Sequence, residues 1–118
     1  MNGNVGIGTW VPAVALDVNG AMYSHSVSNS GTSINWALAN VQGTSSSCTA
    51  MTFTNMQDGG SYALSIEGTT SGTCSFSETG LTFKMPANHG ATMVGTTTLY
   101  GFVRRGTNVF VSWSPESS

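Results

Sequence analysis

Residues 96–113 read TTTLYGFVRRGTNVFVSW, and this stretch predicts two strands, 96–104 and 109–113, joined by a tight turn. The glycine and asparagine of Gly106-Thr107-Asn108 tolerate the backbone angles that a short hairpin requires. Every other residue of the second strand shares a face, which places Val109, Val111 and Trp113 together. The stretch therefore indicates a hairpin with one apolar face that must be covered by other parts of the chain.

Turn residues break the preceding chain into further short runs of alternating polarity. Asp58-Gly59-Gly60 marks one such turn, and the expected strands are residues 33–40, 49–54, 61–67, 73–77 and 81–85. Residues 35–41 alone have a composition compatible with a helix, and the serine, threonine and glycine around them argue against one. We therefore expect an all-β chain in which residues 33–118 form an antiparallel β-sandwich.

Few charges are available to this chain for binding other molecules. Charged residues make up 7% of the sequence, against an average of about 25%, and serine, threonine, asparagine and glycine fill most polar positions. The net charge is −2, with Lys84, Arg104 and Arg105 as the only bases. Three bases cannot supply the phosphate contacts of a nucleic-acid interface or bind an anionic membrane surface. Since no apolar run approaches the length of a transmembrane helix, membrane insertion is not expected either.

Residues 1–32 differ from the rest in having few residues that could build a core. Val5 and Ile7 alternate with glycines, and Leu16 and Val18 flank an aspartate. Asn19-Gly20 is a turn or hairpin signal, and residues 25–32 read as a linker rich in serine and asparagine. Strands interleaved with glycine bury little in one chain. They make sense if three copies wrap together, so that each strand pairs with neighbouring chains.

The same segment carries a recognisable motif. Residues 4–9 read NVGIGT, Pro12 follows, and residues 16–20 read LDVNG. This order resembles a segment of phage tail fibres and related trimeric fibre proteins, where the shaft passes into the next globular module. The resemblance implies a homotrimer in which residues 1–32 are an intertwined β-shaft segment with its linker, and residues 33–118 are the tip. Because Met1 stands directly before the motif, we expect a fragment of a longer fibre chain.

The rest of the chain is similar to the head domains of phage fibres and fibre-like proteins. The shared order is a tryptophan in the first strand, TFTN, DGG with an alternating strand, a short aromatic strand, and a Gly-Thr-Asn turn between two aromatic strands. Here these are Trp36, residues 52–55, residues 58–66, Phe76 and residues 100–111. Family members commonly carry an aspartate just before the last turn, where this chain has Arg104-Arg105. The resemblance implies an adhesin outside the cell or at its surface, on a phage or on a predatory bacterium with phage-like fibres.

Two cysteines, Cys48 and Cys74, stand singly in separate segments rich in serine and threonine. They do not match a zinc pattern, which needs four ligands with close pairs. They form either a disulfide made outside the cytosol or two half-buried free thiols. A disulfide would contribute about 3 kcal/mol by the loop-entropy model.

Catalytic and metal-binding patterns are missing from the sequence. It has no Gly-x-Ser-x-Gly elbow, and His25 and His89 lie in loop-like segments. The five carboxylates are unpaired in sequence, whereas a glycosidase needs two that face each other across a cleft. Asp17-x-Asn19-Gly20 matches the start of a calcium loop but lacks the later acidic ligand. We therefore predict no catalytic residue, no cofactor and no metal site.

Strand direction predicts which loops lie together. If successive strands alternate, with residues 33–40 running away from the shaft, then loops 43–47, 68–72 and 86–94 meet at the far end. Loops 58–60, 78–80 and 105–108 then lie near the shaft. The far loops carry neutral hydroxyl and amide groups, which suit the hydroxyls of a glycan. The residues predicted to bind a glycan are Ser45, Ser46, Thr70, Ser71, Asn88 and His89.

Two functions remain open at this stage. The first is a homotrimeric fibre tip that recognises a bacterial surface glycan or another outer-surface receptor. The alternative is a purely structural head that caps and registers the trimer without binding a ligand. The low charge and the hydroxyl-rich loops favour the first function.

Overall fold

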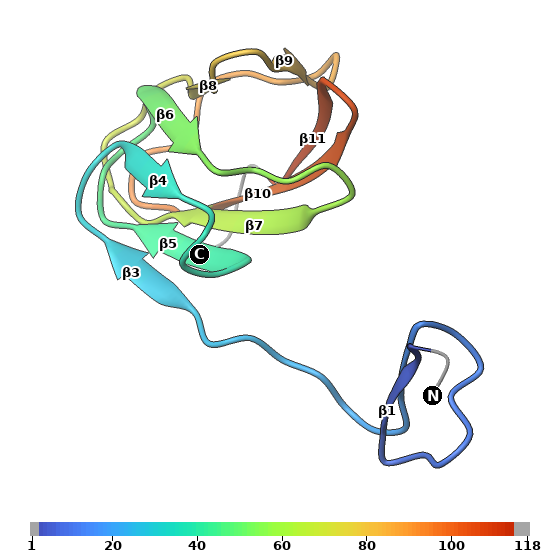
Figure 1. Ribbon diagram of the computed structural model, residues 1–118. Helices are drawn as coiled ribbons and strands as arrows, with labels where there is room; N and C mark the ends of the chain where they lie inside the picture. The colour runs from blue at the N-terminus through green and yellow to red at the C-terminus, as the bar shows by residue number, and fades with distance from the viewer. Residues whose placement is uncertain (1–2, 115–118) are drawn as a thin grey trace.

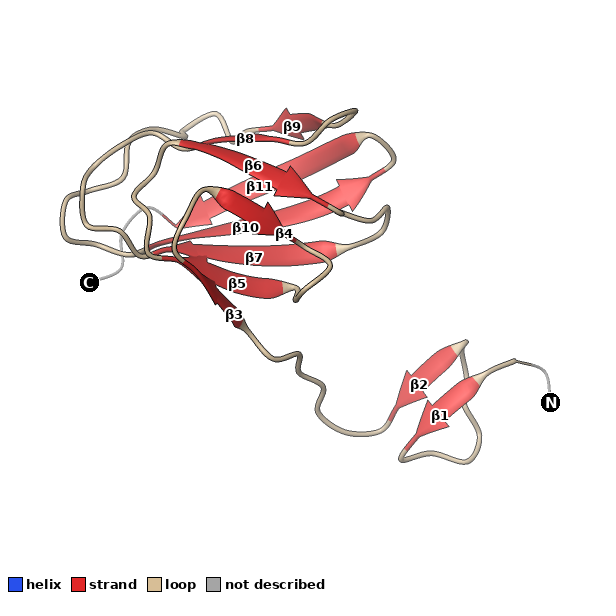
Figure 2. Cartoon of the chain, turned by 60° about the vertical axis from the view of Figure 1, so that its left-hand side comes forward, coloured by secondary structure: helices blue, strands red, loops and turns tan. Residues whose placement is uncertain are grey.

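A computed structural model describes residues 3–114, and all regular secondary structure in this range is β (Figure 1). The strands form a two-stranded, a six-stranded and a three-stranded sheet. The six-stranded and three-stranded sheets face each other across one hydrophobic core (Figure 2). The prediction of an all-β chain with packed sheets is therefore confirmed.

The two-stranded sheet belongs to the N-terminal segment, residues 3–26. Strands β1 (Val5–Ile7) and β2 (Leu16–Val18) pair in parallel, and the connection between them runs through residues 8–15. The N–H of Asn19 donates to the carbonyl of Ile7 at 2.8 Å and extends the ladder. Asn19-Gly20 therefore does not close a hairpin, and the chain continues as a linker to the sandwich (Figure 2).

The sandwich begins with a strand inside the expected linker. This strand, β3 (Val27–Asn29), is an edge of the six-stranded sheet, whose order is β3-β5-β7-β10-β11-β9. The other five strands are β5 (Val41–Thr44), β7 (Ser61–Ile66), β9 (Thr82–Lys84), β10 (Thr98–Arg105) and β11 (Asn108–Ser114). The three-stranded sheet contains β4 (Ser33–Asn35), β6 (Ala50–Thr54) and β8 (Ser75–Ser77).

Strand pairing differs from the prediction of an antiparallel sandwich. From β3 to β9 the chain changes sheet at every step, so sheet neighbours are two strands apart in sequence. Such neighbours run parallel, as in β3–β5, β5–β7, β4–β6 and β6–β8, and β9 also pairs with β11 in parallel. Among the described pairs, β7–β10 and β10–β11 alone are antiparallel. The prediction was wrong because it assumed a hairpin between successive strands, whereas each return run lies in the opposite sheet.

The expected strand 33–40 is also divided. It ends at Asn35, turns, and resumes as β5, whose inward side chains Gln42 and Thr44 are polar and buried. The amide of Gln42 donates to the carbonyls of Asn35 and Ala39 at 2.8 and 2.9 Å. Because these side chains satisfy loop carbonyls inside the sandwich, β5 lacks the apolar alternation that reveals a strand.

Aromatic side chains from both sheets fill the core. Phe53 of β6 lies at its centre, with its ring 5.3 Å from those of Trp36 and Phe76 and 5.1 Å from that of Phe102, measured between centroids. Phe53 and Phe102 are both about 1% exposed. These T-shaped and stacked contacts join the three-stranded sheet to β10 and hold the two layers together.

Candidate functional site

Three loops meet at the end of the sandwich that faces away from the N-terminal segment (Figure 2). We call residues 45–49, 67–74 and 85–97 the distal loops. Gly68 donates its N–H to Ser46 at 3.2 Å, and Gly95 donates to Thr69 at 2.9 Å. The predicted association of these loops is therefore confirmed. The prediction survives the changed topology because successive strands of the sandwich still reverse direction.

A disulfide joins two of the distal loops. Cys48 and Cys74 are bonded, with their Cα atoms 4.5 Å apart, and both are buried. The N–H of Thr92 donates to the carbonyl of Gly72 at 2.8 Å and attaches the third loop to the same place. The distal loops are thus held by covalent and backbone bonds, although they contain little regular structure.

Some of the residues predicted to bind a glycan are exposed to solvent, whereas others are partly buried. Ser45, Thr70, Ser71 and Asn88 are exposed. The hydroxyl of Ser46 is half-buried and donates to the carbonyl of Ser47 at 3.0 Å. Ser47 in turn accepts a hydrogen bond from the N–H of Thr70 at 3.0 Å. Part of the hydroxyl-rich surface therefore serves to hold the loops in place.

His89 is a packing residue and not a free loop histidine. Its Nε2 lies 2.8 Å from the hydroxyl of Tyr100, and its ring lies 4.8 Å edge-on from that of Trp113. Burial lowers the pKa of His89 and raises the pKa of Tyr100 to about 12. Both groups are therefore neutral at neutral pH, and one nitrogen of His89 is already occupied.

The opposite end of the sandwich is built around two adjacent arginines with different roles. Arg104 donates through Nη1 to the carbonyl of Met56 at 2.6 Å and through Nε to the carbonyl of Gly106 at 2.7 Å. Arg105 forms no hydrogen bond or ion pair with another described residue and is exposed. Arg104 thus fixes the β10–β11 turn against the turn at residues 57–60, while the guanidinium of Arg105 stays available.

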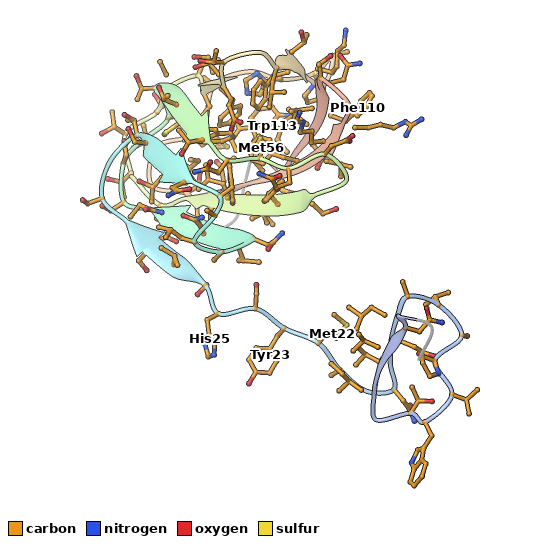
Figure 3. The ribbon with its side chains drawn as sticks, viewed as in Figure 1. Met22, Tyr23, His25, Met56, Phe110 and Trp113 are labelled. Carbon is orange, nitrogen blue, oxygen red and sulfur yellow. A yellow bond between two sulfur atoms is a disulfide. The ribbon has the colours of Figure 1, made fainter. Side chains whose placement is uncertain are left out.

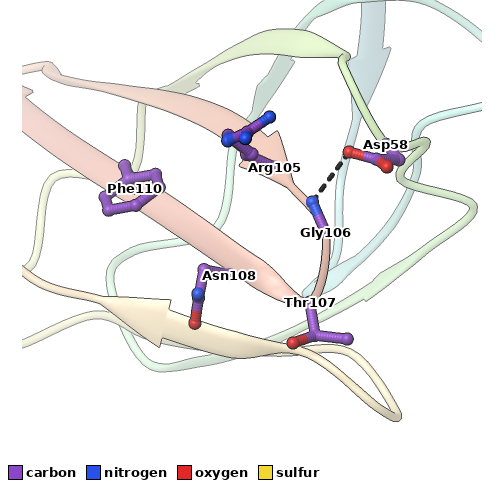
Figure 4. A pocket seen from close by; sticks show the side chains of 6 residues that line it. All are labelled: Asp58, Arg105, Gly106, Thr107, Asn108 and Phe110. Carbon is purple, nitrogen blue, oxygen red and sulfur yellow. Dashed lines mark hydrogen bonds between the residues drawn. The ribbon is translucent and has the colours of Figure 1, made fainter.

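A pocket of about 380 Å³ opens beside this turn (Figure 4). Its lining consists of Asp58, Arg105, Gly106, Thr107, Asn108 and Phe110. Asp58 accepts a hydrogen bond from the N–H of Gly106 through Oδ1 at 2.7 Å, which fixes the carboxylate at the pocket edge. The predicted grouping of loops 58–60 and 105–108 at one end is confirmed, because the N–H of Gly59 donates to the carbonyl of Arg104. These turns are separated along the chain by β7, β8, β9 and β10, and strand direction alone did not indicate a pocket between them.

The described carboxylates have structural partners. Asp17 accepts a hydrogen bond from the N–H of Ala13 at 2.9 Å, Glu67 pairs with the hydroxyl of Ser65, and Glu78 accepts from the N–H of Met56 at 3.3 Å. Glu116 lies outside the described residues. Within residues 3–114, no three His, Cys, Asp or Glu side chains are grouped so that they could hold a metal ion.

Comparison with known protein families, curated proteins and solved structures finds no match to this chain. The part of the chain that the structure describes contains no helix long and apolar enough to cross a membrane.

Proposed function

We propose that this chain is the tip of a homotrimeric fibre and that it attaches the fibre to a glycan on a bacterial surface. The observation that carries the proposal is the exposure of the apolar side chains of the N-terminal segment. Val5, Ile7 and Leu16 each leave more than half of their surface in water, and Trp10 is 99% exposed. A single chain gains almost nothing from ordering this segment.

The two strands of the segment also need partners for their backbones. A two-stranded sheet is marginally stable in water unless its apolar side is covered. Asp17 is its only charged residue, and the Asp17 carboxylate already binds the backbone of Ala13. Identical segments can therefore approach one another without desolvating free charges. The resemblance of residues 4–20 to fibre segments supports three copies around one axis.

The distal loops support the choice of a glycan as the receptor. Their exposed groups include the neutral hydroxyls and amides of Ser45, Thr70, Ser71 and Asn88, next to the exposed apolar side chains of Met93 and Val94. They lie on the side away from the N-terminal segment, where a fibre tip meets its target (Figure 2). Three weak sites held on one axis bind a repetitive surface far more strongly than one site does. The disulfide supports a location outside the cytosol.

Light scattering tests the fibre part of the proposal. The purified chain should have three times the mass of one chain at micromolar concentration. The double change Ile7→Ser and Leu16→Ser should lower that mass, because it removes apolar surface that the copies bury against one another. Val94→Ser, which changes an even more exposed valine in the distal loops, is the control and should leave the mass unchanged. A monomeric wild-type chain would contradict the fibre proposal.

A glycan array tests the receptor part. We expect the wild-type trimer to bind a subset of bacterial oligosaccharides, and we expect the segment variant to bind them more weakly because it loses multivalency. An intact trimer that binds no glycan would favour the alternative, a head that registers the fibre without a ligand.

A further inference from the structure

We infer that the pocket between the Asp58 turn and the β10–β11 hairpin is a saccharide subsite that takes a neutral pyranose ring. The inference rests on the proposed glycan-binding function and places a contact at the end of the sandwich opposite the distal loops. Asp58, Arg105, Asn108 and Phe110 carry it, and all four line the pocket (Figure 4).

Phe110 provides an aromatic surface for the sugar. Phe53, Phe76 and Phe102 are buried in the core, whereas Phe110 is 52% exposed on the outer face of the six-stranded sheet. Figure 3 shows its side chain at the outside of the sandwich. Its backbone is paired with β10, so the ring is presented from a rigid strand. A flat apolar ring of this kind contacts the C–H face of a pyranose.

The polar groups around Phe110 match the hydroxyls of a sugar, which both donate and accept hydrogen bonds. Asp58 uses Oδ1 for the N–H of Gly106 and keeps Oδ2 as a free acceptor. Arg105 lies directly across the hairpin from Asn108. Neither side chain forms a hydrogen bond with another described residue, so both can donate to a ligand.

The charges of the pocket explain why a neutral sugar is expected. Asp58 and Arg105 carry opposite charges, and no ion pair joins them within the described residues. Their charges cancel at the pocket while both groups remain free to bind hydroxyls. An acidic sugar would gain from Arg105 but would be repelled by Asp58.

The pocket is also formed in advance of binding. The side chain of Arg104 donates to the carbonyl of Gly106 within the hairpin turn and to the carbonyl of Met56 beside the Asp58 turn. The N–H of Gly59 donates to the carbonyl of Arg104 at 2.9 Å. A site whose backbone is already fixed loses little entropy when it binds. Its volume of about 380 Å³ falls in the range of about 300–1,000 Å³ typical of ligand pockets.

The test uses the full chain on a printed array of neutral and acidic bacterial oligosaccharides. The strongest neutral binder is then titrated by calorimetry against variants of the chain. Phe110→Ala and Arg105→Gln should each weaken its binding at least about tenfold. Val103→Ala removes the similarly exposed apolar neighbour directly opposite Phe110, outside the pocket, and should change binding less than about twofold. Thr70→Ala serves as the control for the distal loops.

Each contrary result has a separate meaning. Normal binding by Phe110→Ala with loss of binding by Thr70→Ala would overturn the pocket and leave the proposed function standing. Binding restricted to acidic glycans would overturn the neutral-sugar assignment. A smaller particle mass for Phe110→Ala would make Phe110 a contact between copies and would also overturn the subsite. A wild-type trimer that binds no glycan would overturn the subsite together with the receptor part of the proposed function.

Discussion

The N-terminal segment and the sandwich are built from the same kinds of residues, but the sandwich buries its large apolar side chains and the segment exposes them. Both consist of short strands, and both carry few charges. In the sandwich, strands from two sheets cover each other and bury Phe53, Tyr100 and Phe102 almost completely. In the segment, β1 and β2 have no second layer in the single chain, and Trp10 and Tyr23 extend into water.

The difference shows where one chain is sufficient and where it is not. A strand pair becomes stable when a second layer removes one of its faces from water. The sandwich supplies that layer from its own sequence because the chain crosses between the sheets at every step from β3 to β9. The segment is too short to do so, and in the proposed trimer its second layer comes from other copies. Four sets of substitutions test this contrast, beginning with the largest expected effect.

Removing an aromatic ring should matter greatly in the sandwich and hardly at all in the segment. Phe53→Ala should lower the free energy of unfolding by about 3–5 kcal/mol, since it opens a cavity between the two sheets. Trp10→Ala should leave the unfolding of the sandwich unchanged, because Trp10 is 99% exposed. Urea denaturation followed by tryptophan fluorescence measures both. A large loss of sandwich stability in Trp10→Ala would show that the two regions do not unfold independently.

The disulfide should stabilise the sandwich alone. Cys48→Ser with Cys74→Ser should lower the free energy of unfolding by about 3 kcal/mol, because the open loop regains its freedom in the unfolded chain. Particle mass by light scattering should remain that of the wild type, since the bond lies at the end away from the segment. Loss of the oligomer in this variant would mean that the distal loops take part in assembly.

Backbone conformation offers a matched pair of substitutions. Asn55 has a φ of +65°, and Asn55→Ala should cost the sandwich about 1 kcal/mol because alanine resists this region. Gly8 has a φ of +74°, and a Cβ there would lie 2.7 Å from the carbonyl oxygen of Asn19. Gly8→Ala should therefore disturb the β1–β2 pair and lower the particle mass without changing sandwich stability. Thermal unfolding and light scattering on both variants measure these two effects. A lower particle mass in Asn55→Ala, or a less stable sandwich in Gly8→Ala, would contradict the prediction.

The smallest effect concerns pH. Burial lowers the pKa of His89 below its ordinary value of 6.5, so the unfolded chain binds more protons between these two values. The contribution of His89 to stability is complete above pH 6.5 and is lost as the pH falls through the lowered pKa. The urea midpoint should therefore fall less on acidification in His89→Gln than in the wild type. His25→Gln, in the exposed linker, is the control and should behave as the wild type does.

The sequence predicted much of the sandwich but not its pairing. Local turn chemistry and the alternation of apolar and polar residues predicted the hairpin of β10 and β11 and the turn at residues 58–60. The reversal of direction between successive strands predicted the grouping of the distal loops. β5 was missed because Gln42 and Thr44 face inward and bind loop carbonyls. β3 was missed because a strand of three residues at a sheet edge has too little pattern to differ from a linker.

The predicted glycan-binding residues differ in their exposure to solvent, and the sequence indicated that exposure for only some of them. Ser45, Thr70, Ser71 and Asn88 are exposed as expected, because small polar residues in loops remain in water. His89 packs against Tyr100 and Trp113, which no pattern in its own loop indicates. The turns at residues 58–60 and 105–108 were expected at the same end, but the pocket between them was not foreseen, because strand direction does not reveal which side chains line the space between two turns.

The sequence by itself determined that the chain is β throughout, that few charges are available for binding, and where the tight turns lie. These features depend on residue type and on neighbours along the chain, and they hold whatever the rest of the molecule does. Tertiary structure alone decided that the sandwich strands pair mainly in parallel, that Arg104 is used internally while Arg105 is free, and that Phe110 is the exposed phenylalanine of a pocket. These outcomes depend on which distant segments meet, and that is set by the packing of two sheets around one core.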